Sequence, residues 1–194
     1  MSKKHFQTYI TTVTETEVES CFSYVPETTT QKEKATQNTA KKQTTEKATM
    51  EQNENNTPYK SYYKYPLGEA VTKGYSEELT LNKTLNDYRA HTAVDFSGAL
   101  GDKVVAINDG LVTNVYNDSM YGLCVEIDHG AKLVARYCGL ESASVKKGDF
   151  VDIGNTIGTL GKIPCESSDG VHLHLYTKLN NQTVNPLDVM SKTE

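Results

Sequence analysis

Four short runs of β-branched and apolar residues, each bounded by turn-forming residues, constrain the fold of this chain more than any other feature of its sequence. The runs cover residues 103–106, 110–115, 123–127 and 132–137, and the turns beside them read Asn-Asp-Gly, Asp-His-Gly and Lys-Gly-Asp. β-Branched residues suit strands, and strands at this spacing leave no room for the crossover helices that a parallel sheet requires. We therefore predict an all-β domain. Residues 76–85 are the one segment in it for which we expect a helix.

The chain divides into three parts by composition. Residues 27–58 contain no Val, Ile, Leu, Phe, Tyr or Trp and consist mainly of Thr, Lys, Gln and Glu. Such a segment cannot bury enough apolar area to offset its ordering entropy, so we expect a disordered tether. Residues 1–26 have apolar residues at helical spacing, which favours a short anchor-proximal helix, although a frayed polar arm fits equally well. The folded domain is expected over residues 59–194.

The charge and hydropathy of the chain exclude some partners. The formal net charge is −5 and the isoelectric point about 5.6, so no basic surface for nucleic acid is expected. No apolar run is long enough to span a bilayer, and the N-terminus lacks the apolar core of a signal peptide. We expect the chain itself to be a soluble segment, while an anchor removed from its N-terminus would leave no trace.

Four cysteines, Cys21, Cys124, Cys138 and Cys165, are present without a CxxC pair. A structural zinc knuckle is therefore not expected, and an even number permits disulfides without indicating them. For Cys124 and Cys138 we favour the role of small buried hydrophobic residues.

Two histidines lie two positions apart in the stretch VHLHLY, as His172 and His174. Side chains alternate between the two faces of a strand, so both imidazoles would share one face and both leucines the other. Upstream, His91 and Asp95 are four residues apart in HTAVDFSG, which the sequence favours as a strand. Two histidines and an aspartate are suitable zinc ligands, and three protein ligands leave a fourth position open for water, as in catalytic zinc sites. The alternative is that these are hydrogen-bonded strand histidines without a metal.

Taken together, these motifs resemble the LytM-type, or lysostaphin-like, zinc metallopeptidases, which cleave peptide bridges of bacterial cell walls. The resemblance covers residues 87–189 and includes GDKVVAINDGLV, YGLCVEIDHG, VKKGDFVDIGNTIGTLG and VNPLDV. It implies a small antiparallel β-sheet domain with a groove. It also implies that Zn²⁺ is bound by His91, Asp95 and His174, with His172 as a candidate catalytic residue facing the substrate. His129, at a turn, resembles the structural histidine of the family.

The sequence departs from the family at one catalytic position. Active members carry a second catalytic histidine in a Tyr-x-His-Leu pattern, and this chain has Gly139 there, in the stretch RYCGL. Glycine can neither transfer a proton nor donate to an oxyanion, and loss of a positioned acid or base typically costs about 10²–10⁴ in rate. Cys138 is a poor substitute because neighbouring strand residues point to opposite faces. We expect His172 to be vestigial and the metal to stabilise the fold or a binding surface.

The layout of a short segment, a polar tether and one degenerate LytM domain resembles family members that act in endospore formation. This implies a single-pass protein of the forespore membrane, with its domain in the space facing the mother-cell membrane. It also implies stage III sporulation protein AH as the partner, in engulfment and in a trans-envelope channel, and peptidoglycan as a second candidate partner.

Two other functions remain open at this stage. One is an active peptidoglycan endopeptidase in which water, Tyr137 or another group replaces the missing histidine. The other is a degenerate activator of a cell-wall amidase, against which the retained zinc ligands count.

Overall fold

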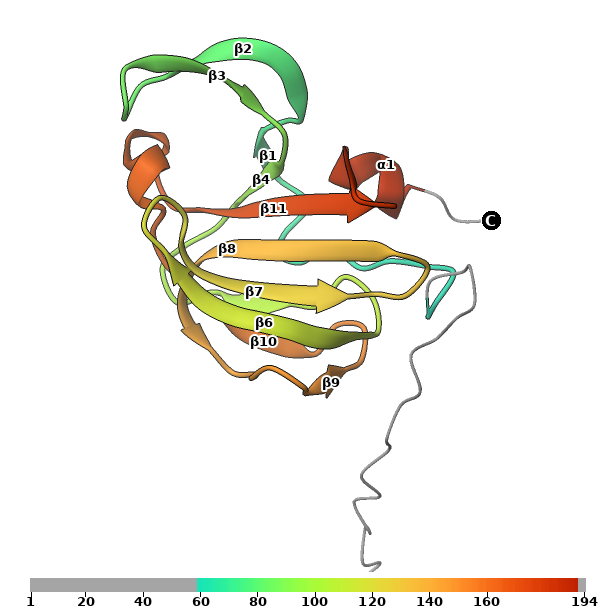
Figure 1. Cartoon of the computed structure of the whole chain (residues 1–194). Helices are drawn as coiled ribbons and strands as arrows, with labels where there is room; N and C mark the ends of the chain where they lie inside the picture. The colour runs from blue at the N-terminus through green and yellow to red at the C-terminus, as the bar shows by residue number, and fades with distance from the viewer. Residues whose placement is uncertain (1–58, 192–194) are drawn as a thin grey trace, which may run out of the picture. The chain divides into compact units, whose positions relative to one another are not determined.

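The computed structural model describes residues 59–191, which form twelve strands, one 3₁₀-helix and one short α-helix (Figure 1). The strands are β1 (Val71–Lys73), β2 (Ser76–Asn82), β3 (Asp87–His91), β4 (Val94–Ser97), β5 (Lys103–Val105), β6 (Gly110–Asp118), β7 (Gly122–Asp128), β8 (Leu133–Ala143), β9 (Phe150–Val151), β10 (Thr156–Leu160), β11 (His172–Leu179) and β12 (Gln182–Val184). The helices are η1 (Pro164–Asp169) and α1 (Pro186–Met190). The expected anchor-proximal helix, the tether and Cys21 lie outside the described residues.

The strands form one large antiparallel sheet and a separate two-stranded sheet. The large sheet has ten strands, and its main path runs β1-β4-β11-β8-β7-β6-β9, with β10 bridging β8 and β5 and with β12 on β11. The second sheet is the β2–β3 hairpin, which stands above one end of β11 in Figure 1. The prediction of an all-β, antiparallel domain is confirmed. Within residues 59–191 no helix is both long and apolar enough to cross a membrane.

The hydrophobic core is built from alternate residues of the long strands. In β8, Leu133, Ala135 and Tyr137 are buried, and in β11 Leu173 and Leu175 are fully buried. Burial of each leucine contributes about 1.5–3 kcal/mol. Because both leucines of β11 face the core, the register of this strand is fixed, and a slip by one residue would turn them to the other face.

The predicted helix over residues 76–85 is wrong, because residues 76–82 are strand β2 of a hairpin. Leu79 and Leu81 alternate with Thr80 and Asn82, and the chain turns back through Asn86, which has a positive φ of 54°. Thr80, Asn82 and Arg89 of the hairpin line a groove together with His174 of the large sheet. Leu79, Leu81 and Tyr88, in contrast, are 67%, 46% and 69% exposed. A local pattern of period two was therefore present, but its apolar side faces solvent.

Candidate metal centre

Strand β11 presents both histidines of VHLHLY on one face, as the alternation predicts. His172 and His174 are 1% and 4% exposed, and the leucines between and after them face the core. On one side β11 pairs with β4, so that His174 lies opposite Asp95. On its other side it pairs with β8, where His174 lies opposite Cys138.

His91 and Asp95 meet because the chain bends between them. Four residues of continuous strand would separate them by about 13 Å. Instead β3 ends at His91 in the hairpin, and β4 begins at Val94 in the large sheet. His91 Nε2 therefore lies 3.1 Å from Asp95 Oδ2. The sequence predicted the pair but not the corner that brings its side chains together.

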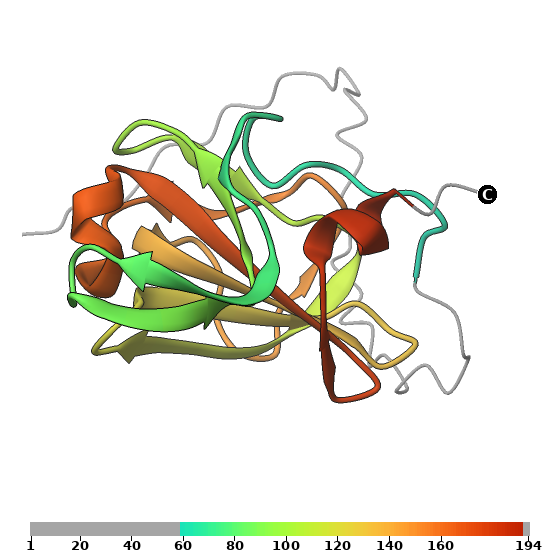
Figure 2. The same cartoon turned by 90° about the horizontal axis from the view of Figure 1, so that it is seen from above.

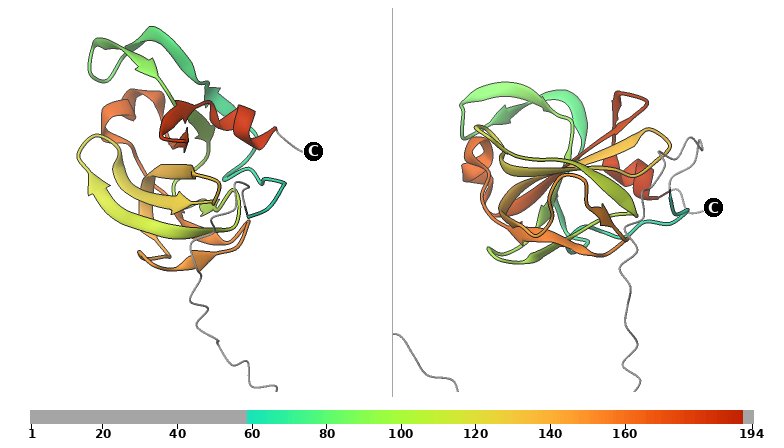
Figure 3. Two further views of the ribbon diagram at one scale, coloured as in Figure 1. Left: turned by 45° about the vertical axis from the view of Figure 1, so that its right-hand side comes forward. Right: turned by 60° about the horizontal axis from the view of Figure 1, so that its bottom comes forward.

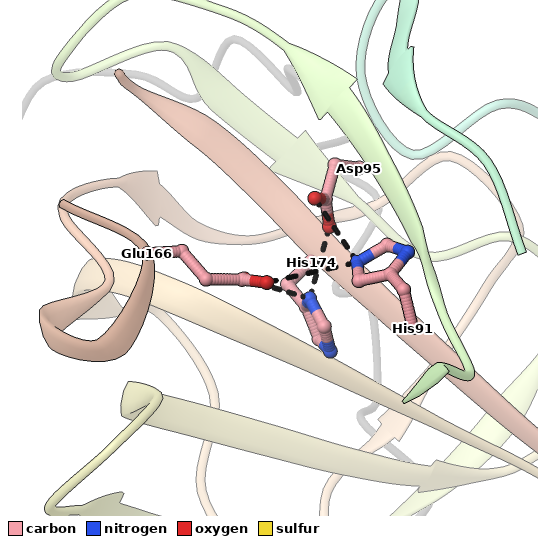
Figure 4. Close-up of side chains that lie close together, drawn as sticks. All are labelled: His91, Asp95, Glu166 and His174. Atoms are coloured by element: carbon pink, nitrogen blue, oxygen red, sulfur yellow. Dashed lines mark hydrogen bonds and ion pairs between the residues drawn. The ribbon is translucent and has the colours of Figure 1, made fainter. Parts of the chain in front are cut away.

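Four side chains converge at this corner, as Figure 4 shows. Donor atoms of His91, Asp95, Glu166 and His174 all lie within 4.8 Å of one another, and all four residues are buried. His174 Nδ1 is 2.9 Å from Asp95 Oδ1 and 3.1 Å from Glu166 Oε2. The structure thus brings the three expected ligands together and adds a fourth residue, the acidic Glu166.

The buried polar atoms of this group fit a metal ion. His91 donates from Nδ1 to the carbonyl oxygen of Gly74 at 2.8 Å, which orients the ring and leaves Nε2 free to bind a metal. In the described part of the chain, His91 Nε2 and Asp95 Oδ2 have no hydrogen-bond partner, although they lie 3.1 Å apart. Two buried acceptors aimed at one point are costly unless a cation lies between them. Imidazole nitrogens with carboxylate oxygens are the donor set of a borderline divalent ion such as zinc.

Glu166 was not anticipated from the sequence. It lies in η1, only eight residues before His174 but far from His91 and Asp95 along the chain, and no spacing rule connects it to them. Its side chain is 4% exposed, and Lys73 Nζ contacts it at 3.3 Å. His172 Nε2 also lies 3.3 Å from Glu166 Oε2. In the sequence, the only available signal was an acidic residue eight positions before His174.

The carboxylates and imidazoles shift one another's pKa values. Burial alone would lower the pKa of His174, but hydrogen bonds to Asp95 and Glu166 outweigh burial and raise it to about 9. Burial would likewise lower the pKa of His172, but its hydrogen bond to Glu166 outweighs burial, so the pKa of His172 is raised. For Asp95 and Glu166, burial favours the neutral acid, but the neighbouring histidines lower both pKa values. Both carboxylates are therefore charged at neutral pH.

His172 does not face an open groove. Its ring is buried, with Nδ1 3.1 Å from the carbonyl oxygen of Gly170 and Nε2 against Glu166. The groove beside the site is lined instead by His91, Glu166 and His174, together with residues of the hairpin and Tyr121. His172 is therefore not among the residues that line this groove, and its role as a candidate catalytic residue stays a prediction.

The space at Gly139 is filled by another side chain. Gly139 has a φ of +86°, which L-residues with a side chain rarely adopt. A Cβ added there would lie 2.6 Å from Ile163 Cγ1 and 2.9 Å from Ile163 Cδ1. Both the backbone and the packing at this position therefore exclude a side chain in the present fold.

Other residues near the missing histidine do not replace it. Tyr137 is fully buried in the core, where its hydroxyl accepts a hydrogen bond from Ile107 N–H and contacts His129 Nε2, so the suggestion that Tyr137 substitutes is wrong. Cys138 lies opposite His174, but its hydrogen bond with the Cys124 thiol and its burial raise the pKa of its own thiol.

The cysteines of the described region are free thiols. Cys124, Cys138 and Cys165 are all buried, as expected for the first two. His129 is buried away from the site.

Comparison with known proteins identifies the family. The family model for peptidase family M23 matches residues 89–186, about half of the chain. This chain belongs to that family, the LytM-type metallopeptidases, which confirms the resemblance drawn from its motifs.

The similar proteins include peptidases and a chain of a pore-forming complex. The DD-carboxypeptidase/endopeptidase Mpg of Neisseria meningitidis is 33% identical over 113 residues, which are 58% of this chain and 26% of that protein. The chain therefore spans about a quarter of the length of these curated relatives. A chain of the SpoIIQ–SpoIIIAH pore-forming complex is 25% identical with a TM-score of 0.61, covering 69% of this chain and 93% of that one. A zinc-containing peptidase from Vibrio cholerae is 25% identical with a TM-score of 0.59, covering 68% and 40%.

Proposed function

We propose that this chain is a zinc-binding, non-catalytic LytM-domain protein of sporulation whose domain binds a partner protein. The partner would be stage III sporulation protein AH, reached across the space between the forespore and mother-cell membranes, in support of engulfment and a trans-envelope channel. The likeness to SpoIIQ supports this, because the domain aligns over almost the whole of that structure. Residues 27–58 would supply the spacer that holds the domain away from an anchoring membrane.

The observation that carries the non-catalytic part of the proposal is the filled space at Gly139. In active members of the family this position holds a histidine that handles protons or the oxyanion. Here Ile163 lies where a Cβ at this position would have to go, which supports the proposal that no catalytic side chain acts from this position. Removal of one positioned acid or base costs about 10²–10⁴ in rate, and a neighbouring residue does not compensate.

We propose Zn²⁺ as the bound metal, with His91, Asp95 and His174 among its ligands. When bound to an open site, zinc polarises a carbonyl group and lowers the pKa of a water molecule. In a domain that lacks half of the proton-transfer apparatus, its remaining effect is on stability. An ion that binds only the folded state stabilises it by about 4 kcal/mol at 1,000 times its Kd.

The β2–β3 hairpin offers a surface for the partner. Its outer face exposes Leu79, Leu81 and Tyr88, which share one side of the hairpin because Leu81 pairs with Tyr88. Contiguous exposed apolar side chains on a soluble domain typically mark an interaction site. The inner face of the same hairpin lines the metal centre, so metal binding and partner binding would be coupled through it.

The test is a binding measurement between the zinc-loaded protein and purified stage III sporulation protein AH from the same organism. We expect specific binding that weakens when zinc is removed and weakens more than tenfold in the double variant Leu79→Ser, Leu81→Ser. Glu141→Ser, an exposed residue of β8, is the matched control and should bind normally. Absence of binding by the folded, zinc-loaded protein would overturn the partner assignment.

The second candidate is an active peptidoglycan endopeptidase. It is favoured by the intact set of His91, Asp95 and His174 with His172 beside it, and by curated relatives described as endopeptidases. It predicts cleavage of muropeptides that is abolished by His91→Ala. An amidase activator has less support, because such a role gives no reason to keep the metal-binding residues.

A further inference from the structure

We infer that Glu166 is a fourth protein ligand, which closes the metal centre and makes it a structural rather than a catalytic zinc site. This inference rests on the proposed zinc binding. The proposed function requires only that zinc is bound. The present inference concerns the fourth coordination position, which a catalytic zinc site leaves open for water.

The distances among the donor atoms match a four-ligand cage. At zinc–ligand distances of about 2.0–2.1 Å, two ligands of a tetrahedral site lie roughly 3.3 Å apart. Glu166 Oε2 lies 3.1 Å from His174 Nδ1, and Glu166 Oε1 lies 3.7 Å from His91 Nε2. The separations of Asp95 from the same two nitrogens are 2.9 and 3.1 Å. Glu166 therefore approaches His174 much as the ligand Asp95 does, and it approaches His91 at a longer separation.

Backbone contacts hold Glu166 in this place without help from its own side chain. The N–H of Cys165 donates to the carbonyl oxygen of Met120, and Asn82 Nδ2 donates to the carbonyl oxygen of Cys165 at 3.0 Å. The N–H of Ser168 donates to Thr84 Oγ1 at 3.0 Å. These bonds fix η1 to the β6–β7 turn and to the hairpin, and Figures 2 and 3 show η1 and the hairpin at the same end of β11.

The buried charge supports a divalent ion among four ligands. Asp95 and Glu166 are two carboxylates that are 1% and 4% exposed. Two buried negative charges require compensation, and a single Zn²⁺ that displaces the proton held between His174 and the two carboxylates would balance them with two neutral imidazoles. Lys73 contacts Glu166 from the solvent side, where it also contacts Asp169 at 3.5 Å, so its charge is shared.

The alternative role for Glu166 is a general base that acts on a metal-bound water. A base of this kind hydrogen-bonds to the water and is separated by it from the metal ligands. Glu166 Oε2 instead lies 3.1 Å from His174 Nδ1, the same nitrogen that Asp95 Oδ1 approaches at 2.9 Å, which is the separation of two ligands of one ion. His172 Nε2, at 3.3 Å, contacts Glu166 Oε2 in the manner of an outer hydrogen-bond partner of a ligating carboxylate.

The experiment compares wild type, Glu166→Ala and the control Asp169→Ala, which changes another acidic residue of η1 outside the donor set. Zinc affinity is measured by competition with a chelator, and the open position is probed by adding azide to the Co²⁺-substituted proteins. We expect Glu166→Ala to lose more than the roughly 10–100-fold in affinity that removal of an outer partner costs. We also expect azide to change the Co²⁺ absorption of Glu166→Ala but not of wild type or Asp169→Ala. Circular dichroism and Glu166→Gln, which keeps the size of the side chain, separate this effect from misfolding.

The outcomes separate this inference from the proposed function. If wild type binds no zinc, the proposed zinc site itself fails. If wild type binds zinc but Glu166→Ala binds it equally well, or if azide alters the wild-type spectrum, the site is open and Glu166 is not a ligand. Unchanged zinc affinity in Glu166→Gln together with loss of muropeptide cleavage would make Glu166 a general base instead.

Discussion

The packing around Gly139 leads to a quantitative prediction for Gly139→Ala. The added methyl group would lie 2.6 Å from Ile163 Cγ1, closer than real Cβ contacts, on a residue with a φ of +86°. The change therefore introduces a strained backbone and a steric clash together. It tests directly whether the position of the missing histidine is closed.

The magnitude follows from these two contributions. A left-handed conformation costs a residue with a Cβ about 1–2 kcal/mol, and overpacking of a buried position costs about 1–3 kcal/mol. We expect Gly139→Ala to reduce the free energy of unfolding by about 2–5 kcal/mol. Gly148→Ala isolates the first contribution, because Gly148 has a φ of +91° and none of the described atoms lies within 4 Å of its added Cβ.

The assay is urea unfolding of wild type, both glycine variants and the Gly139→Ala, Ile163→Ala pair, at one zinc concentration. Gly139→Ala should be less stable than Gly148→Ala by about 1–3 kcal/mol, and Ile163→Ala should recover that difference in a double-mutant cycle. Equal destabilisation by the two glycine variants, with no coupling to Ile163, would mean that the space at Gly139 is open. The packing argument against a catalytic side chain there would then be refuted.

Two further predictions concern the metal centre and a buried histidine. Zinc should raise the Tm of wild type and leave that of His91→Ala unchanged, because an ion that binds only the folded state stabilises it; equal zinc-dependent shifts in thermal melts would contradict this. Burial lowers the pKa of His129 to about 4. Below pH 6.5 this histidine therefore binds a proton in the unfolded chain but stays neutral in the folded chain until the pH approaches 4. Stability should therefore fall by about 3 kcal/mol as the pH falls from 6.5 to 4. His129→Gln should remove that part of the slope in urea titrations across this range, and an unchanged slope would show that His129 is not its source.

Features that depend on the alternation of apolar and polar residues along a single strand could be predicted from the sequence. The leucines of VHLHLY face the core, and so the histidines between them share the other face. The same reasoning gave the strand at Asp95. The strand β2 was missed because its apolar residues face solvent, so the usual link between apolar residues and burial did not apply.

The rest of the site depends on contacts between segments distant in sequence. Glu166 reaches the centre because the backbone of η1 is tied to side chains of the hairpin and to the backbone of the β6–β7 turn. Ile163 fills the space at Gly139 through a contact that no spacing rule describes. A single sequence therefore predicts which residues bind the metal and which histidine is missing, but not which side chains occupy the positions around them.

The measurement that tests the central claim most directly is muropeptide turnover by the protein with its zinc content determined on the same sample. The account predicts one zinc per chain and no cleavage above that of His91→Ala. Cleavage by the zinc-loaded wild type that is lost in His91→Ala would contradict it, and would make this chain an endopeptidase that works without a side chain at Gly139.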